Sequence, residues 1–154
     1  MSIFKGLSLA IEFAHVQRDR AVAQWQIALR TQANGHDQMT QLQQYASETD
    51  QRWALRAEQG TTPELLHHHR QFMERLYQAI QLQGETLGAL DKKVANTRQI
   101  VLNAELRLSS FKKVLASKEM GLKQQQQRQE QKYSDEFAAQ QMQRSLQQRT
   151  EETS

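Results

Sequence analysis

An apolar residue occupies every seventh position through the second half of this 154-residue chain. Taken as the a positions of a heptad, the series runs Leu66, Met73, Ile80, Leu87, Val94, Val101, Leu108, Leu115 and Leu122. The d positions between them are apolar at Leu76, Leu90, Ala104 and Phe111, and polar at His69, Gln83, Thr97 and Lys118. A heptad repeat sustained over this length is typical of a left-handed coiled coil, because it keeps one stripe of the helix facing a partner helix.

The segment around the only proline predicts where one helix ends and the next begins. Gly60 suits the left-handed residue that follows a helix, Thr62 suits an N-cap, and Pro63 suits the first helical position. We expect one helix over about residues 5–59, a turn at 60–62, a second helix over about 63–148 and a frayed tail at 149–154. So short a connection makes the helices antiparallel, which predicts a single all-α coiled-coil hairpin over residues 1–154. The alternative is a three-helix bundle with a break at Asn34–Gly35.

The first helix carries a weaker heptad repeat. Its a positions include Trp25 and Trp53, which we expect in the core, and its d positions include Ala14, Ala21 and Ala28. Small residues at these d positions would let the two helices approach closely. Antiparallel pairing about the turn places each residue opposite the one whose number is about 123 minus its own.

The second helix is predicted to be longer than the first and to overhang it. Residues 123–132 are polar on every side, and a small apolar group follows, with Tyr133, Phe137, Ala138, Met142 and Leu146. Under the pairing rule the first helix has no residue opposite this stretch. We therefore expect the helix from about residue 123 to 146 to be unpaired within the monomer.

Three glycines fall at one height of the predicted hairpin. The pairing rule places Gly35 opposite about residue 88, close to Gly84 and Gly88. Glycine inside a helix costs about 1 kcal/mol relative to alanine, so this height is predicted to be a soft point.

Composition excludes several classes of protein. There is no Cys, so neither a disulfide scaffold nor a thiolate metal site is possible, and six Gly with one Pro are too few for a turn-rich β fold. No stretch of about 20 apolar residues predicts a membrane span, and no targeting segment is expected. The chain has no phosphate-binding loop and no nucleophile motif. We therefore expect a cytoplasmic protein that is not an enzyme and has no cofactor.

Two clusters of basic or metal-ligating residues are candidate sites. The run His67–His69 is not expected to bind a metal, because neighbouring residues on a helix point about 100° apart. Between Lys92 and Lys118, seven basic residues accompany only Glu105, which gives a local net charge of +6. A solvated face, an acidic protein partner or nucleic acid would each account for it. Nucleic acid is not expected as a partner, because Phe111 is the only aromatic residue there and it lies at a d position.

One flank of the predicted hairpin carries an apolar strip. It combines d and g positions of both helices, namely Gln38, Leu42, Tyr45 and Thr49 with Phe72, Leu76, Ala79 and Gln83. Ordinary packing beside the seam is one interpretation. The other is a docking strip for another protein, because an exposed aromatic flank on a polar rod is a natural anchor.

The chain resembles the FliJ family of flagellar export proteins over nearly its whole length. The resemblance lies in residues 38–52 (QMTQLQQYASETDQR), residues 71–80 (QFMERLYQAI) and residues 131–144 (QKYSDEFAAQQMQR), in this order and at these distances from the turn. It implies a soluble component of the flagellar type III export apparatus, similar to the central stalk of rotary ATPases. A stalk of the related virulence secretion systems and a generic coiled-coil scaffold are the alternatives.

The resemblance also implies partners and the surfaces that bind them. The expected partners are the flagellar export ATPase with its regulator, the cytoplasmic domain of the export gate membrane protein, and export chaperones, with membrane association only through these partners. The gate-binding residues would be Gln38, Leu42, Tyr45, Phe72, Leu76 and Ala79. The chain termini would enter the ATPase ring and favour its assembly, through Phe4, Leu7, Ile11, Tyr133, Phe137 and Met142. Thr49 and Gln83 depart from the family's bulkier choices.

Overall fold

The computed structural model describes residues 2–153, and these are α-helical apart from Thr153 and the short connection between two long helices. Helix α1 spans Ser2–Glu58 and helix α2 spans Pro63–Glu152, and no strand occurs within residues 2–153. α1 is unbroken at Asn34–Gly35, so the three-helix alternative is wrong. Helix α2 continues past its expected end near residue 148 to Glu152, because these residues include no helix breaker. Of the tail expected over 149–154, Thr153 is a turn and Ser154 lies outside the described residues.

The connection between the helices has the chemistry that its sequence predicts. Gly60 has a φ of 110°, in the left-handed region that glycine adopts without strain, and its amide donates to the carbonyl of Ala57 at 3.1 Å. The amide of Leu65 donates to the Thr62 hydroxyl oxygen at 3.2 Å, which makes Thr62 the N-cap of α2. Pro63 begins the helix, where its missing N–H costs nothing.

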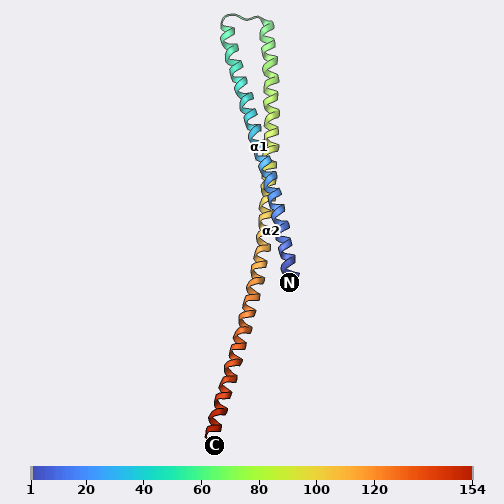
Figure 1. Ribbon diagram of the computed structural model, residues 1–154. Helices are drawn as coiled ribbons and strands as arrows, with labels where there is room; N and C mark the ends of the chain where they lie inside the picture. Colours follow the sequence, from blue (N-terminus) through green and yellow to red (C-terminus); the bar gives the residue numbers. More distant parts are fainter. Residues whose placement is uncertain (1, 154) are drawn as a thin grey trace. The chain divides into compact units, whose positions relative to one another are not determined.

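The chain divides into two compact units, and Phe13–Arg107 is the larger. Within it α1 and α2 run antiparallel and packed against each other, joined by the connection at one end (Figure 1). The buried residues fall at the predicted a and d positions, namely Ala14, Ala21, Ala28, Gly35 and Ala46 on α1, and Met73, Leu76, Leu87 and Val101 on α2. The Gln32 side-chain amide donates to Asp91 at 2.7 Å, in agreement with the pairing rule. The antiparallel coiled-coil hairpin is therefore confirmed.

The glycines predicted to form a soft point have different surroundings. A Cβ on Gly35 would lie 3.0 Å from side-chain carbons of both Leu87 and Leu90, whereas a Cβ on Gly88 would meet nothing within 4 Å. A Cβ on Gly84 would make ordinary contact with Met39, at 3.7 Å. Gly35 is thus required for close approach of the helices, and Gly88 is not.

The second unit combines residues 2–12 of α1 with residues 108–153 of α2. Leu108 is buried and Phe111 and Leu115 are partly buried, but Leu122 is 46% exposed. Leu122 is the last a position of the repeat and was expected to lie in the seam. This expectation is wrong. The pairing rule places Leu122 opposite residue 1, which lies outside the described residues.

Beyond the seam, every residue from 116 to 153 is exposed, and this segment is called the overhang below. Within this unit, the orange and red part of α2 continues past the blue start of α1 (Figure 1). The predicted overhang of the second helix is confirmed.

Candidate interaction surfaces

Two aromatic side chains from different helices meet on one flank of the Phe13–Arg107 unit. The rings of Tyr45 on α1 and Phe72 on α2 lie edge to face, with centroids 6.1 Å apart and an interplanar angle of 80°. Both stay accessible, at 49% and 41% exposed. Edge-to-face geometry is favourable for aromatic pairs, so the two rings hold each other in place on an open surface.

The other residues of the predicted docking strip differ in how accessible they are. Leu76 is only 8% exposed and belongs to the core cluster with Ala46 and Met73, against which Leu42 packs. Leu42 and Ala79 are partly buried and Gln38 is exposed. The strip therefore consists of an accessible aromatic pair above a packed floor, and Leu76 supports it from below.

Gln83, a predicted member of the strip, forms hydrogen bonds to the facing helix. The side-chain amide of Gln83 donates to the Gly35 carbonyl at 2.9 Å and to the Gln38 side-chain oxygen at 3.4 Å. Gln83 is partly buried, so it supplies a polar link between the helices at a position where a coiled coil usually has an apolar side chain.

The opposite flank carries a polar cluster that the sequence reading missed. The hydroxyl of Tyr77 donates to one carboxylate oxygen of Asp50 at 3.1 Å, and the other oxygen lies 3.3 Å from His69 Nε2. The His69 ring stacks on Trp53 at 4.4 Å with an interplanar angle of 6°. Asp50 and Tyr77 both occupy e positions of the heptad. This shared position is the only feature of the sequence that predicts a contact between them.

Asp50 changes the acidity of Tyr77. The hydrogen bond to the Asp50 carboxylate, and then the negative charge of that carboxylate, raise the pKa of the Tyr77 hydroxyl above its usual 10.0. A shallow hollow of about 530 Å³ adjoins this pair, lined also by Arg70, Met73 and Glu74. The hydrogen bond joins α1 to α2, so the pair links the two helices of the hairpin.

The histidine run does not assemble into a metal site. His67 and His68 are exposed, whereas His69 turns toward the seam and stacks on Trp53. Within residues 2–153 no group of three His, Cys, Asp or Glu side chains is placed to hold a metal ion. In the same residues, neither helix contains an apolar stretch that is long enough to cross a membrane.

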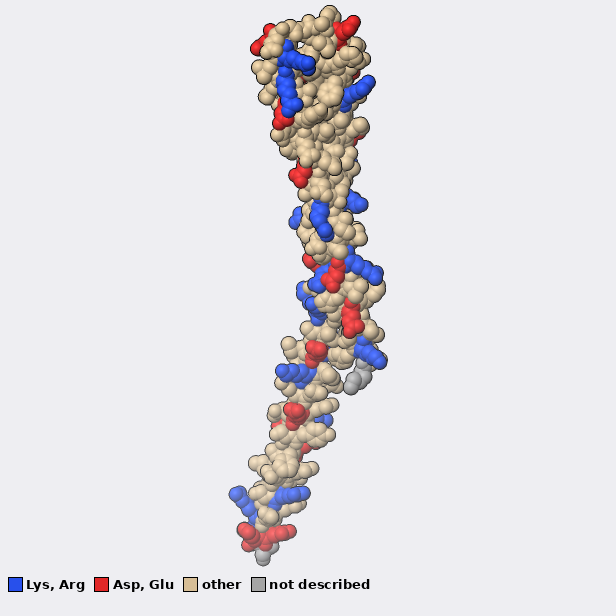
Figure 2. Space-filling model, turned by 45° about the horizontal axis from the view of Figure 1, so that its top comes forward, with Lys and Arg blue, Asp and Glu red and all other residues tan. Residues whose placement is uncertain are grey.

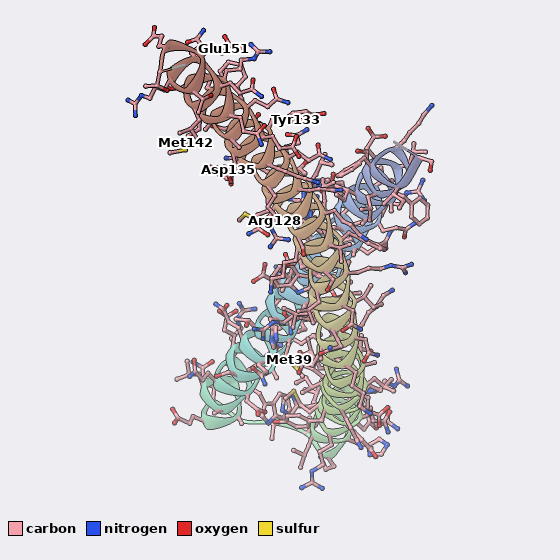
Figure 3. The ribbon with its side chains drawn as sticks, turned by 90° about the horizontal axis from the view of Figure 1, so that it is seen from below. Met39, Arg128, Tyr133, Asp135, Met142 and Glu151 are labelled. Carbon is pink, nitrogen blue, oxygen red and sulfur yellow. The ribbon has the colours of Figure 1, made fainter. Side chains whose placement is uncertain are left out.

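The large apolar residues of the outer part of the overhang are exposed. Tyr133 is 74% exposed, Phe137 63%, Met142 70% and Leu146 57%. Tyr133 and Met142 project from different sides of the helix (Figure 3). At about 100° per residue, Tyr133 and Phe137 share one side while Met142 and Leu146 share the other. The overhang thus offers two apolar patches on opposite faces.

Polar surface separates these patches. On the face that Figure 2 shows, acidic and basic side chains are interspersed along this part of α2, with uncharged surface between them. Gln131 donates to Asp135 one turn further on, at 3.2 Å, as on an ordinary solvated helix. Such a surface presents no strong field of either sign.

The expected ATPase-binding residues near the N-terminus have a different environment. Phe4, Leu7 and Ile11 are partly buried, at the a and d positions of the second unit. Much of their surface is therefore packed in the seam between the helices. Of the residues predicted to bind the ATPase, the accessible ones are Tyr133, Phe137 and Met142.

Comparison with known proteins gives one match. The sequence model of a protein family described as the flagellar FliJ protein matches residues 4–147, which includes both helices and the connection. No curated protein and no solved structure matches the chain significantly. The matched residues cover most of the chain, and the family consists of non-enzymatic components of the flagellar export apparatus. The chain therefore belongs to the flagellar FliJ family.

Proposed function

We propose that this chain acts as the stalk of the flagellar export ATPase, with the overhang entering the ATPase ring and promoting its assembly. The observation that carries the proposal is that every residue from 116 to 153 is exposed while the segment remains helical to Glu152. A long isolated helix is marginal in water, because it gains nothing from packing. A partner that surrounds the overhang would supply the missing contacts.

The placement of the apolar residues favours a surrounding partner over a one-sided one. Tyr133 and Phe137 face one side and Met142 faces another, so a single flat surface would cover only one patch. A ring of subunits has a bore that contacts a helix from several sides. Phe4, Leu7 and Ile11 would hold the base of the overhang to α1 rather than contact the ring directly.

We further propose that the docking strip contacts the cytoplasmic domain of the export gate membrane protein. The support is the accessible Tyr45–Phe72 pair, since aromatic anchors over a packed floor are typical of binding hot spots. Through this contact the protein would stay cytoplasmic and peripheral to the inner membrane. We also propose that the chain escorts export chaperones and contacts the ATPase regulator. Only the family resemblance supports these two roles.

The stalk proposal is tested by measuring ATP hydrolysis and ring assembly with the purified export ATPase. The variant Tyr133→Ser with Phe137→Ser should lose most of the stimulation of hydrolysis. The variant Leu55→Ser is the matched control, because Leu55 is 66% exposed but lies outside the overhang. Equal stimulation by the double variant and the control would reject the stalk role.

A further inference from the structure

An apolar groove lies between the helices of the Phe13–Arg107 unit, further from the connection than the docking strip is. Two adjoining hollows of about 250 and 220 Å³ share Gln17, Ala21 and Ile100. The remaining lining residues are Phe13, Ala14, Arg20, Gln24, Thr97, Asn103, Ala104 and Arg107. We call the combined feature the alanine groove.

The groove exists because small residues meet at two successive d layers of the coiled coil. Ala14 and Ala104 line one hollow together, and Ala21 and Thr97 line the other. At the equivalent layer beneath the docking strip the pair is Leu42 and Leu76, which pack together and fill the space. Two small side chains cannot fill the space that two leucines fill, so the flank is hollowed here.

The floor of the groove is apolar and its rims carry accessible apolar side chains. The Thr97 hydroxyl donates to the Lys93 carbonyl at 2.8 Å within its own helix, so it does not need a polar partner from outside. Phe13 is 60% exposed and Ile100 is 56% exposed. Side chains of this size on an open surface, beside a floor of alanines, are the arrangement that lets another helix approach closely.

The charged residues of the lining are of one sign. Arg20 and Arg107 lie among the lining residues, and no Asp or Glu does. Within the same unit, residues 92–107 of α2 carry Lys92, Lys93, Arg98 and Arg107 against Glu105, so this part of α2 has a basic excess. This charge favours an occupant with carboxylates on both sides of its apolar stripe.

We propose that the alanine groove binds an amphipathic helix of a partner protein, with apolar residues at i, i+3 or i+4 and i+7 and acidic residues flanking them. The lining runs from Phe13 to Gln24 along α1, about 17 Å, which corresponds to about three turns of the bound helix. The site lies on the same flank as the Tyr45–Phe72 pair, because Gln17, Ile100, Tyr45 and Phe72 all occupy g positions. It goes beyond the proposed stalk function and stands independently of it.

The test uses the full-length chain and a fluorescent synthetic helix of about 18 residues, with Leu on one face, Glu flanking it and Ala elsewhere. Fluorescence anisotropy should show saturable binding that weakens as salt is added. A second peptide with Lys in place of every Glu should bind at least about tenfold more weakly. Equal binding of the two peptides, or no binding of the acidic one, would overturn the proposal.

Variants of the chain locate the binding site. Ile100→Ser should weaken binding of the acidic peptide about tenfold or more, whereas Leu102→Ser, at a residue 43% exposed outside the groove, should not. Gln17→Trp should also abolish binding, because it fills the groove while adding apolar area. Thermal unfolding followed by circular dichroism checks that each variant keeps the fold. Binding that Ile100→Ser and Gln17→Trp leave unchanged would show that the peptide lies elsewhere.

Sedimentation of the chain alone tests the other occupants. If a concentration-dependent dimer forms and Ile100→Ser abolishes it, the occupant is a second copy and the partner assignment is wrong. If single-stranded DNA binds with the same dependence on Ile100 and Gln17, the groove recognises a polyanion rather than a helix. A monomer that binds only the acidic peptide through these residues supports the proposal.

Discussion

The side-chain amide of Gln83 donates to the backbone carbonyl of Gly35 at 2.9 Å, across the two helices of the hairpin. A side chain on residue 35 would crowd this approach, since a Cβ there would lie 3.0 Å from carbons of Leu87 and Leu90. The close packing at Gly35 and the hydrogen bond from Gln83 are therefore both possible because glycine has no side chain. The predicted soft point thus contains one glycine that the packing needs.

A pair of glycine-to-alanine variants separates packing from helix propensity. Gly88→Ala should raise the free energy of unfolding by about 0.5–1 kcal/mol, because its new Cβ meets nothing within 4 Å and alanine favours the helix. Gly35→Ala should lower it, because Leu87 and Leu90 must move to make room. Urea unfolding of the two variants and the parent measures both. Equal stabilisation by the two changes would show that Gly35 is replaceable.

The Tyr77–Asp50 hydrogen bond predicts a pH dependence of stability. The pKa of Tyr77 is raised in the folded chain, so the neutral hydroxyl is favoured there relative to the unfolded chain. The stabilisation is fully present below the unfolded pKa of about 10 and is lost as the pH rises through the higher folded value. Tyr77→Phe should therefore lower the melting temperature at pH 8, with the difference shrinking as the pH passes that folded value.

Two further variants check the assignment of this pH effect. Asp50→Asn should lower the pKa of Tyr77, measured by ultraviolet titration of the tyrosines, because the carboxylate charge is gone. Tyr133→Phe serves as the control, since Tyr133 is 74% exposed on the overhang and its change should leave the melting temperature unaltered. A melting temperature that Tyr77→Phe leaves unchanged at pH 8 would mean that the hydrogen bond adds nothing to stability.

Sequence alone predicts the seam well, because the heptad repeat and the turn chemistry are local signals. Val101 and Leu108 are buried as their a positions predict, and Gln32 meets Asp91 as the pairing rule predicts. Leu122 shows the limit of the pattern, since it occupies an a position of the repeat and is nevertheless exposed.

The side-chain contacts of the flanks could not be predicted in the same way. Tyr77 reaches Asp50, although the pairing rule places residue 50 opposite about residue 73. Long side chains at e and g positions choose among several neighbours, and the heptad pattern does not decide between them. The accessibility of Phe72 and the burial of Leu76 likewise follow from packing in three dimensions.

The docking strip predicts that two neighbouring substitutions affect different properties, one the stability of the hairpin and the other the binding of the gate domain. Leu76→Ala should destabilise the hairpin by about 2–5 kcal/mol, because Leu76 is 8% exposed and packs in the core cluster. Phe72→Ala should change the melting temperature much less, because Phe72 is 41% exposed, yet it should weaken binding to the gate domain by about 2 kcal/mol or more. Calorimetric binding and thermal unfolding are measured on both. A large loss of stability in Phe72→Ala with gate binding intact would make Phe72 a core residue.

The overhang predicts a contrast in amide hydrogen exchange along a single helix. In the isolated chain, amides of residues 123–148 should exchange much faster than those of Val94–Leu108, because every residue of the overhang is exposed and its backbone hydrogen bonds open by fraying. Gly121→Ala should slow exchange on both sides of residue 121, since the new Cβ meets nothing within 4 Å and only helix propensity changes. Addition of the export ATPase should then protect residues 130–146, where Tyr133, Phe137 and Met142 lie, and leave Val94–Leu108 unaltered. Slow exchange of the overhang before the ATPase is added would mean that the helix is stable without a partner. Protection confined to residues 2–12 would move the ATPase contact to the start of α1.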